Sequence, residues 1–194
     1  PAHPIRHELK PGKSSSRAVQ NPGAPQSPEN PPAGRSKIRE HLRCKFAGNI
    51  TIKGDRQTVS LGKRSTFARV SILSQEGKDV RIGSDCMFSR GIEVRTTDAH
   101  SLIDISSGKR INEAGHVTIG SHVWVGLSCV ISKGVSIADD CVIGAMSFVN
   151  RSCHESGVVL AGSPAKIVRR GVTWSRKRKS IYTLDEMLSW HAKD

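Results

Sequence analysis

The fold is decided by residues 117–137, which read VTIGSHVWVGLSCVISKGVSI. A branched apolar residue returns at every sixth position, and a small residue usually follows it. A period of six is neither the helical period nor the signature of one long strand. The same phase continues past this stretch and gives one series: Ile119, Val125, Ile131, Ile137, Ile143 and Val149. An internal repeat of this kind takes precedence over ordinary helix or strand assignments.

The repeat predicts a solenoid of short strands. Each six-residue unit would form one side of a coil, with its apolar residue pointing inward and stacking on its equivalents in neighbouring coils. Glycines interrupt any long strand, at Gly120, Gly126, Gly134 and Gly144. A second and smaller inward position follows four residues after each apolar one: Val123, Cys129, Val135, Cys141, Ser147 and Cys153.

This small inward position accounts for most of the cysteines. Cys129, Cys141 and Cys153 occupy it at intervals of twelve, and Cys86 occupies it relative to Ile82. A free cysteine in such a place behaves as a small apolar residue. The five cysteines form an odd set without a CxxC pair, which argues against a disulfide framework and a thiolate zinc site. We therefore expect a reducing, cytoplasmic location.

Composition divides the 194 residues into three parts. Residues 1–45 hold eight of the nine prolines, so we expect a disordered or extended basic arm, either a solvated tail or a binding element, with a short helix over Arg35 to Lys45. Residues 46–170 would form the solenoid domain. Its repeat lapses over residues 97–116, which predicts a protruding loop where function tends to gather. No apolar run of about 18 residues and no signal-peptide core are present, so no transmembrane segment is expected.

Residues 171–194 combine a basic segment with a short predicted helix. Thr183 would be its N-cap and Glu186 would complete a capping box. Four residues give this helix an apolar face: Leu184, Met187, Leu188 and Trp190. Because the ends of a solenoid need covering, we expect the helix to cap the last coil.

The net charge of +13 calls for an anionic partner. Basic residues gather in the first 45 positions and between Lys166 and Lys179. One reading is a non-catalytic scaffold that binds an anionic polymer, either nucleic acid or an acidic polysaccharide. The basic segments lack the interleaved aromatic residues that stack on bases, which argues against nucleic acid.

Three segments resemble the hexapeptide-repeat O-acetyltransferases: Ile119-Gly-Ser-His-Val-Trp-Val-Gly126, Ile143-Gly-Ala-Met-Ser147 and Ala161-Gly-Ser-Pro-Ala-Lys-Ile-Val-Arg169. The resemblance covers about residues 48–174. It implies an all-β fold, a left-handed parallel β-helix with three hexapeptides per coil, assembled as a homotrimer. The segment Arg95-Thr-Thr-Asp-Ala-His-Ser-Leu-Ile-Asp104 is similar to the subgroup that acetylates bacterial capsular polysaccharides such as polysialic acid.

The activity implied by the resemblance is transfer of an acetyl group from acetyl-CoA to a saccharide hydroxyl. The acceptor would be a cell-surface polysaccharide or its precursor, with an acidic polysaccharide as one candidate; an amino sugar or a small foreign molecule is the alternative. The catalytic histidine of the family corresponds to His100, which would act as general base because an alcohol is a poor nucleophile until its proton is removed. Asp98 would either orient His100 or cap the loop turn.

Trp124 lies between the two inward positions, so its ring should project outward. An exposed indole on such a wall favours a contact with substrate, cofactor or a neighbouring subunit. The resemblance places Trp124 in the active site, and the alternative is an aromatic residue of the trimer interface.

For acetyl-CoA, the resemblance points to six residues: Leu127, Ala145, Asn150, Arg151, Lys166 and Arg169. Basic side chains suit the phosphates of the coenzyme, although Lys166 and Arg169 could equally form a solvated edge. Many family members have Thr-Lys where this chain has Asn150-Arg151, so the charge is kept and the hydroxyl is lost.

A metal site is not expected. Zinc-dependent carbonic anhydrases share the fold and bind metal through three histidines across a subunit interface. Side chains on one face should recur every eighteen residues, and His100, His116 and His122 do not show that spacing.

Overall fold

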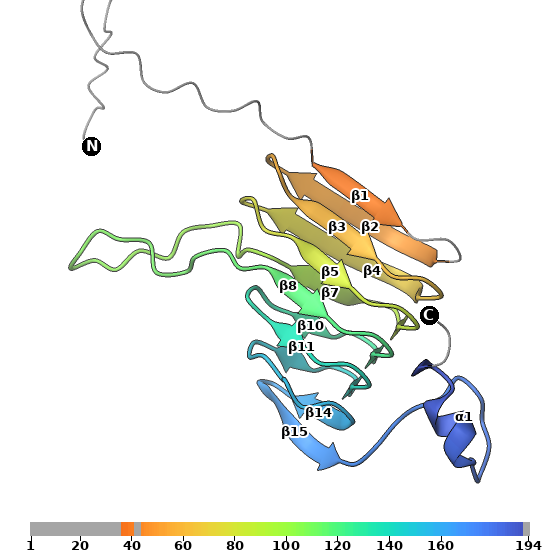
Figure 1. Ribbon diagram of the computed structural model, residues 1–194. Coiled ribbons are helices and arrows are strands. Elements are labelled where there is room, and N and C mark those ends of the chain that lie inside the picture. The colour runs from red at the N-terminus through yellow and green to blue at the C-terminus, as the bar shows by residue number, and fades with distance from the viewer. Residues whose placement is uncertain (1–35, 41–43, 192–194) are drawn as a thin grey trace, which may run out of the picture. The chain divides into compact units, whose positions relative to one another are not determined.

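The computed structural model describes residues 36–40 and 44–191, which lie within one compact unit, Ala33–Asp194 (Figure 1). Most of the arm expected over residues 1–45 therefore lies outside the described residues. Within it, Lys37–Glu40 form strand β1, so the helix predicted over Arg35 to Lys45 is wrong for these four residues. The reason is tertiary pairing, because β1 lies in parallel register on Thr58–Leu61 and this ladder overrides the local preference.

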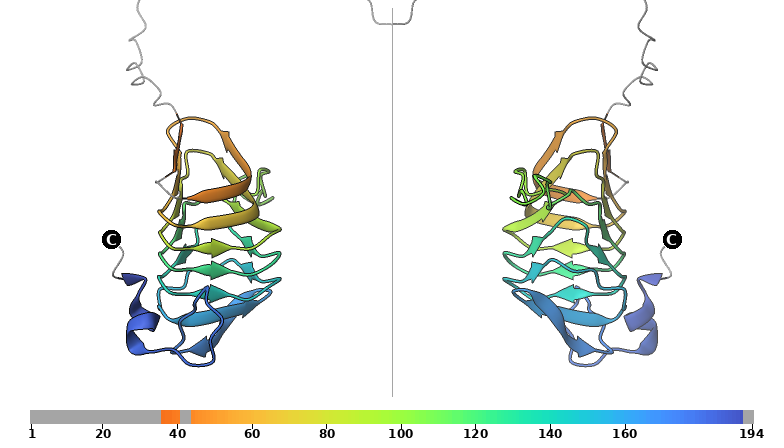
Figure 2. Two further views of the ribbon diagram at one scale, coloured as in Figure 1. Left: turned by 90° about the vertical axis from the view of Figure 1, so that its right-hand side faces the viewer. Right: turned by 90° about the vertical axis from the view of Figure 1, so that its left-hand side faces the viewer.

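The chain forms a parallel β-solenoid, as the repeat predicted, and its coils have the three faces that the resemblance implied (Figure 2). The first face stacks β1, β3 (Thr58–Leu61), β5 (Val80–Ile82), β8 (Val117–Ile119) and β11 (Ser136–Ile137). The second stacks β6 (Met87–Phe88), β9 (Trp124–Val125), β12 (Val142–Ile143) and β14 (Val158–Gly162). The third stacks β7 (Ile92–Arg95), β10 (Val130–Ile131) and β13 (Phe148–Val149). The longer strands β2 (Lys45–Lys53) and β4 (Thr66–Gln75) run through the second and third faces.

The predicted inward positions form the core. The six residues of the apolar series from Ile119 to Val149 are at most 3% exposed, and those of the smaller series from Val123 to Cys153 at most 6%. Each buried branched side chain contributes roughly 1.5–3 kcal/mol relative to an exposed one. The cysteines of the small position are therefore packing residues, and burial raises the pKa of the Cys86 and Cys141 thiols to about 12.

Successive coils approach closely at the corner between the first and second faces. A Cβ atom on Gly83 would lie 2.6 Å from the backbone carbonyl carbon of Gly120 in the next coil. Real Cβ contacts are longer, and the backbone at this point is fixed by ladder hydrogen bonds on both sides. Glycine is therefore required here by the coil spacing and not by a special backbone angle.

After β14, strand β15 (Ala165–Arg170) pairs with it antiparallel, and its Ala165 and Ile167 pack against the end of the core. Helix α1 (Leu184–Leu188) follows with the predicted capping box of Thr183 and Glu186. In Figures 1 and 2, α1 lies beside the coils, and Trp190, just after the helix, stacks on the His122 ring of the solenoid wall. Among the described residues, no helix has the length and apolar character to cross a membrane.

Candidate functional site

The interrupting loop leaves the wall between the third and first faces. It follows β7 and rejoins the ladder at β8, and Figure 1 shows it projecting on the side opposite α1. Its two arms are joined by a bridge between Ile103 and Arg110 and by the hydrogen bond from the Ile111 amide to the Leu102 carbonyl, 2.8 Å. The loop is thus an ordered, hairpin-like projection rather than a loose connection.

His100 lies on the outgoing arm of this loop and is exposed. Its backbone carbonyl accepts a hydrogen bond from Asn112 Nδ2 at 2.8 Å. Within residues 36–40 and 44–191, the imidazole itself makes no hydrogen bond or ion pair, so both ring nitrogens are open to a ligand. The preceding residue, Ala99, has a left-handed backbone with φ of 64°, which turns the chain at this point.

Asp98 connects the loop to Lys133 of the next coil. Its Oδ2 accepts hydrogen bonds from Lys133 Nζ and, at 2.8 Å, from Asn112 Nδ2. The Lys133 ammonium and then the Asn112 amide lower the pKa of the Asp98 carboxyl. In the described part of the chain these contacts hold Asn112, and none of them reaches the His100 ring, so the two roles expected for Asp98 stay predictions.

Asn112 is the centre of this support, and it was not predicted. Its Oδ1 accepts from the Leu102 amide at 2.7 Å and from Arg110 Nε at 3.1 Å, while its Nδ2 donates to Asp98 and to the His100 carbonyl. One side chain therefore connects both arms of the loop to the wall.

Trp124 lies on β9 with 39% of its surface exposed, which confirms that its ring projects outward. Because β9 belongs to the second face and the loop leaves between the third and first faces, Trp124 and His100 lie on different sides of the solenoid within one chain. The ring of Trp174 lies beside it, with 6.0 Å between centroids and 44° between planes. Trp174 had no role assigned to it from the sequence.

The six residues expected at the coenzyme fall into three places. Leu127 and Ala145 follow strands of the second face at successive coils, and the Met146 amide donates to the Leu127 carbonyl at 2.7 Å. Asn150 and Arg151 lie after β13, on the edge from which the loop projects. The remaining two, Lys166 and Arg169, are on β15. All six are exposed, so each is open to a ligand.

His122 is buried, in contrast to His100. Its Nδ1 lies 2.8 Å from Asp140 Oδ1, and its ring is stacked between Trp174 and Trp190 with centroid distances of 4.5 Å and 4.7 Å. From the sequence, His122 was considered only as one of three histidines whose spacing does not fit a metal site. Among the described residues, no group of three histidine, cysteine or acidic side chains could hold a metal ion.

Comparison with known proteins shows which families and structures the chain is similar to. Residues 116–151 match the family described as the hexapeptide repeat of succinyl-transferase. The polysialic acid O-acetyltransferase of Escherichia coli O1:K1 / APEC is 38% identical over 159 residues, which cover 80% of this chain and 51% of that protein. The polysialic acid O-acetyltransferase of Neisseria meningitidis is 38% identical over 120 residues, covering 62% and 56%. The chain thus spans about half the length of the curated relatives it matches.

A solved structure extends the match to three dimensions. The crystal structure of the polySia specific acetyltransferase NeuO aligns with a TM-score of 0.75 and 38% identity, covering 82% of this chain and 74% of that one. The alignment therefore covers more of the chain than residues 116–151 of the family match. With its six-residue repeat, its interrupting loop and this degree of identity, the chain belongs to the hexapeptide-repeat acetyltransferases, the family of the polysialic acid O-acetyltransferases.

Proposed function

We propose that this protein is an O-acetyltransferase that moves an acetyl group from acetyl-CoA to a hydroxyl of a saccharide. The observation that carries the proposal is the ordered loop that projects an exposed histidine from the wall of a solenoid of this family. Histidine titrates near neutral pH, so it can both take and return a proton during one reaction. The loop fixes its backbone through Asn112 while leaving its ring free.

In the proposed reaction, the His100 imidazole takes the proton of the acceptor hydroxyl while that oxygen attacks the thioester carbonyl carbon. The carbon–sulfur bond then breaks as the carbonyl re-forms, and the imidazolium returns its proton to the departing thiolate. Acetylated saccharide and free thiol are the products, and His100 is restored. Backbone N–H groups at the site would stabilise the oxyanion that forms between the two steps.

An acyl-enzyme on cysteine is not part of this proposal. The thiolate is the nucleophilic form of cysteine, and burial raises the pKa of Cys86, Cys129 and Cys141. These thiols stay protonated and enclosed in the core at neutral pH. Direct transfer with a general base needs none of them.

For acetyl-CoA, the exposed basic side chains fit a ligand that carries several phosphate charges. Arg151, Lys166 and Arg169 make no side-chain hydrogen bond or ion pair with any described residue, so their charges are available. Leu127 and Ala145 form a small apolar strip at successive coils that suits the less polar part of the coenzyme. We propose that these residues bind the donor, with Asn150 beside Arg151.

The proposed site requires more than one subunit. His100 and Trp124 lie on different sides of the solenoid, so a site that uses both must combine the loop of one chain with the second face of another. Repeating such a head-to-tail contact around a closed ring gives a cyclic oligomer. We propose the homotrimer that the family resemblance implies.

We propose an acidic polysaccharide at the cell surface, or its precursor, as the acceptor. The names of the relatives and the net charge of +13 support an anionic acceptor, to which the basic residues of positions 1–45 and 171–194 would add attraction. All five cysteines are unpaired, which supports a reducing compartment and hence the cytoplasm as the place of the reaction.

The test is acceptor-dependent release of free thiol from acetyl-CoA, measured over charged and neutral oligosaccharides with the wild type and His100→Ala. We expect release to need an acceptor, to be faster with the charged series, and to fall by about 10²–10⁴-fold in His100→Ala. His154→Ala is the matched control, since His154 is also exposed but lies at a coil corner away from the loop.

Each outcome separates one part of the proposal. Full turnover by a folded His100→Ala oligomer would exclude His100 as the base. Equal rates on charged and neutral acceptors would exclude charge as the basis of acceptor choice. Failure of the wild type to bind acetyl-CoA would favour the non-catalytic scaffold instead.

A further inference from the structure

We infer that Trp174 is a positioning residue of the candidate active site, because it holds the indole of Trp124 in place. The inference rests on the proposed function, in which Trp124 contacts a substrate. It assigns a role in the reaction to Trp174 alone among residues 172–190, here called the C-terminal strap, a segment that from the sequence was expected only to cap the last coil.

The first step is that Trp174 is fixed to the strand that carries Trp124. Its Nε1 donates to the backbone carbonyl of His122 at 2.8 Å, and its ring stacks on the His122 ring at 4.5 Å with 11° between planes. Trp174 is 8% exposed, so this hydrogen bond is shielded from water. His122 lies two residues before Trp124, so the anchor and the ring it supports share one short segment.

The second step is the direct contact between the two indoles. A centroid distance of 6.0 Å and an interplanar angle of 44° lie within the range in which aromatic rings attract one another. Trp124 keeps 39% of its surface open, so Trp174 supports one side and leaves another free for a ligand. A side chain on the outer wall of a solenoid has few neighbours, and this support therefore restricts how the ring can turn.

The third step is that the strap is also held against the coils that precede the one carrying Trp124. Arg176 donates to the carbonyl of Cys86 at 2.8 Å and to Thr66 Oγ1 at 2.9 Å, and its guanidinium lies 5.7 Å from the centre of the Trp174 ring. Thr66, Cys86 and His122 belong to successive coils. The strap therefore crosses the corner between the first and second faces and is fixed at several levels.

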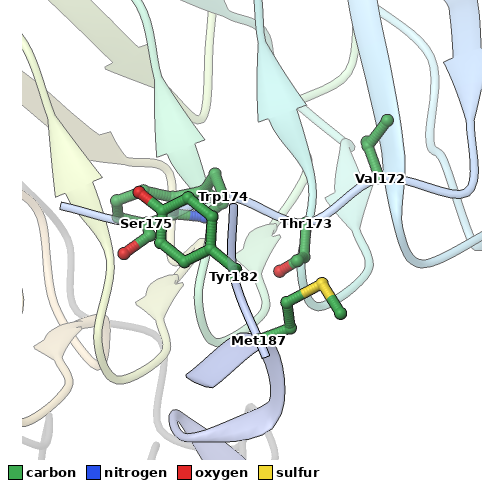
Figure 3. A pocket seen from close by; sticks show the side chains of 6 residues that line it. All are labelled: Val172, Thr173, Trp174, Ser175, Tyr182 and Met187. Carbon is green, nitrogen blue, oxygen red and sulfur yellow. The ribbon is translucent and has the colours of Figure 1, made fainter. Parts of the chain in front are cut away.

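On its outer side, Trp174 is not enclosed by solid packing. It borders a cavity of about 240 Å³ that is also lined by Val172, Thr173, Ser175, Tyr182 and Met187 (Figure 3). The position of the indole is therefore set by its contacts with the wall, to His122 and Trp124, more than by the helix outside it. Loss of the indole would leave Trp124 facing open space.

The experiment compares Trp174→Ala, Trp174→Phe and the control Trp190→Ala in the full chain. Trp190 also stacks on His122, at 4.7 Å, but has no ring contact with Trp124 among the described residues. We expect Trp174→Ala to lower kcat/KM by about tenfold, since small displacements at a reacting site are costly. Trp174→Phe should restore most of this loss. Trp190→Ala should lower Tm but leave kcat/KM within about twofold of wild type, since only the position of Trp124 is expected to matter for the reaction.

A second measurement follows Trp124 without using activity. In a Trp190→Phe background, replacing Trp174 by Phe or Ala leaves Trp124 as the sole tryptophan of the chain. We expect stronger acrylamide quenching and lower fluorescence anisotropy of Trp124 in the Ala variant than in the Phe variant. Equal values in both would overturn the inference, as would an equal loss of kcat/KM in Trp190→Ala and Trp174→Ala.

The two proposals fail separately. A wild type without acceptor-dependent thiol release refutes the proposed function, and the fluorescence comparison then decides alone whether Trp174 positions Trp124. An active wild type in which Trp174→Ala keeps full kcat/KM refutes the inference and leaves the proposed function standing.

Discussion

Replacing Asn112 with alanine should loosen the loop that carries His100 without unfolding the solenoid. The amide of Asn112 makes four hydrogen bonds, two as acceptor and two as donor, at 2.7–3.1 Å. All four join loop residues to one another or to Asp98 at the wall. Alanine removes all four, while the core residues under the loop keep their contacts.

The magnitude follows from these bonds. Because Asn112 is only half-buried, each bond is taken at the lower end of the usual range, about 0.5 kcal/mol, which gives a total of about 2 kcal/mol. With about 1.4 kcal/mol for each factor of ten, the loop should open about 30-fold more often. Two amides report this opening. The Leu102 amide donates to the Asn112 side chain, and the Ile111 amide donates to the Leu102 carbonyl of the opposite arm.

Hydrogen exchange followed by mass spectrometry measures this opening directly. Peptides covering Leu102 and Ile111 should exchange about 30-fold faster in Asn112→Ala, whereas strand peptides of the solenoid keep their rates. The control is Ser106→Ala, which removes one exposed hydrogen bond to Asp104 at the loop tip and should change these rates by about twofold at most. Exchange in Asn112→Ala within about threefold of wild type would show that Asn112 does not hold the loop.

Three further predictions concern stability. Ile143→Ala empties a fully buried core position and should lower the free energy of unfolding by about 2–5 kcal/mol in urea titrations; a loss under about 1 kcal/mol would mean that the core refills the space. Hydrogen bonds from Arg110 and then from Thr97 lower the pKa of Glu76 in the folded state. The ionised Glu76 side chain therefore stabilises the fold fully above its unfolded-state pKa, and this stabilisation is lost as the pH falls through its folded-state pKa. The Tm difference between wild type and Glu76→Gln should therefore disappear in acid, and a constant gap from pH 6 to pH 3 would contradict it. Gly83→Ala should cost about 1–3 kcal/mol in the same titrations because its Cβ meets the backbone of Gly120, and an unchanged midpoint would show that the coils can move apart.

The solenoid could be predicted because its signal is repeated. From Ile119 to Val149 the same position returns in every unit, and each repetition is buried in the structure. Strand β1 could not be predicted, because Lys37–Glu40 carries three charged residues around Ile38 and is set by its pairing with β3. An edge strand of this kind takes its conformation from its neighbour and not from its own pattern.

The site was only partly predictable for a related reason. His100 and Trp124 were identified from the resemblance, and their exposure agrees with the expected roles, which stay predictions. Lys133 reaches Asp98 across 35 positions and Trp174 reaches His122 across 52. Such contacts depend on which coil corners lie above one another, and neither the path of the loop nor that of the strap can be read from the repeat.

The separation of the loop from the second face has one consequence for mixtures of variants. A chain with His100→Ala keeps an intact Trp124, and a chain with Trp124→Ala keeps an intact loop. Neither would be active alone, but a ring assembled from both contains junctions that unite the intact halves, about a quarter of all junctions for random mixing in equal amounts. Two inactive proteins, unfolded and refolded together, would thereby recover activity that neither shows by itself.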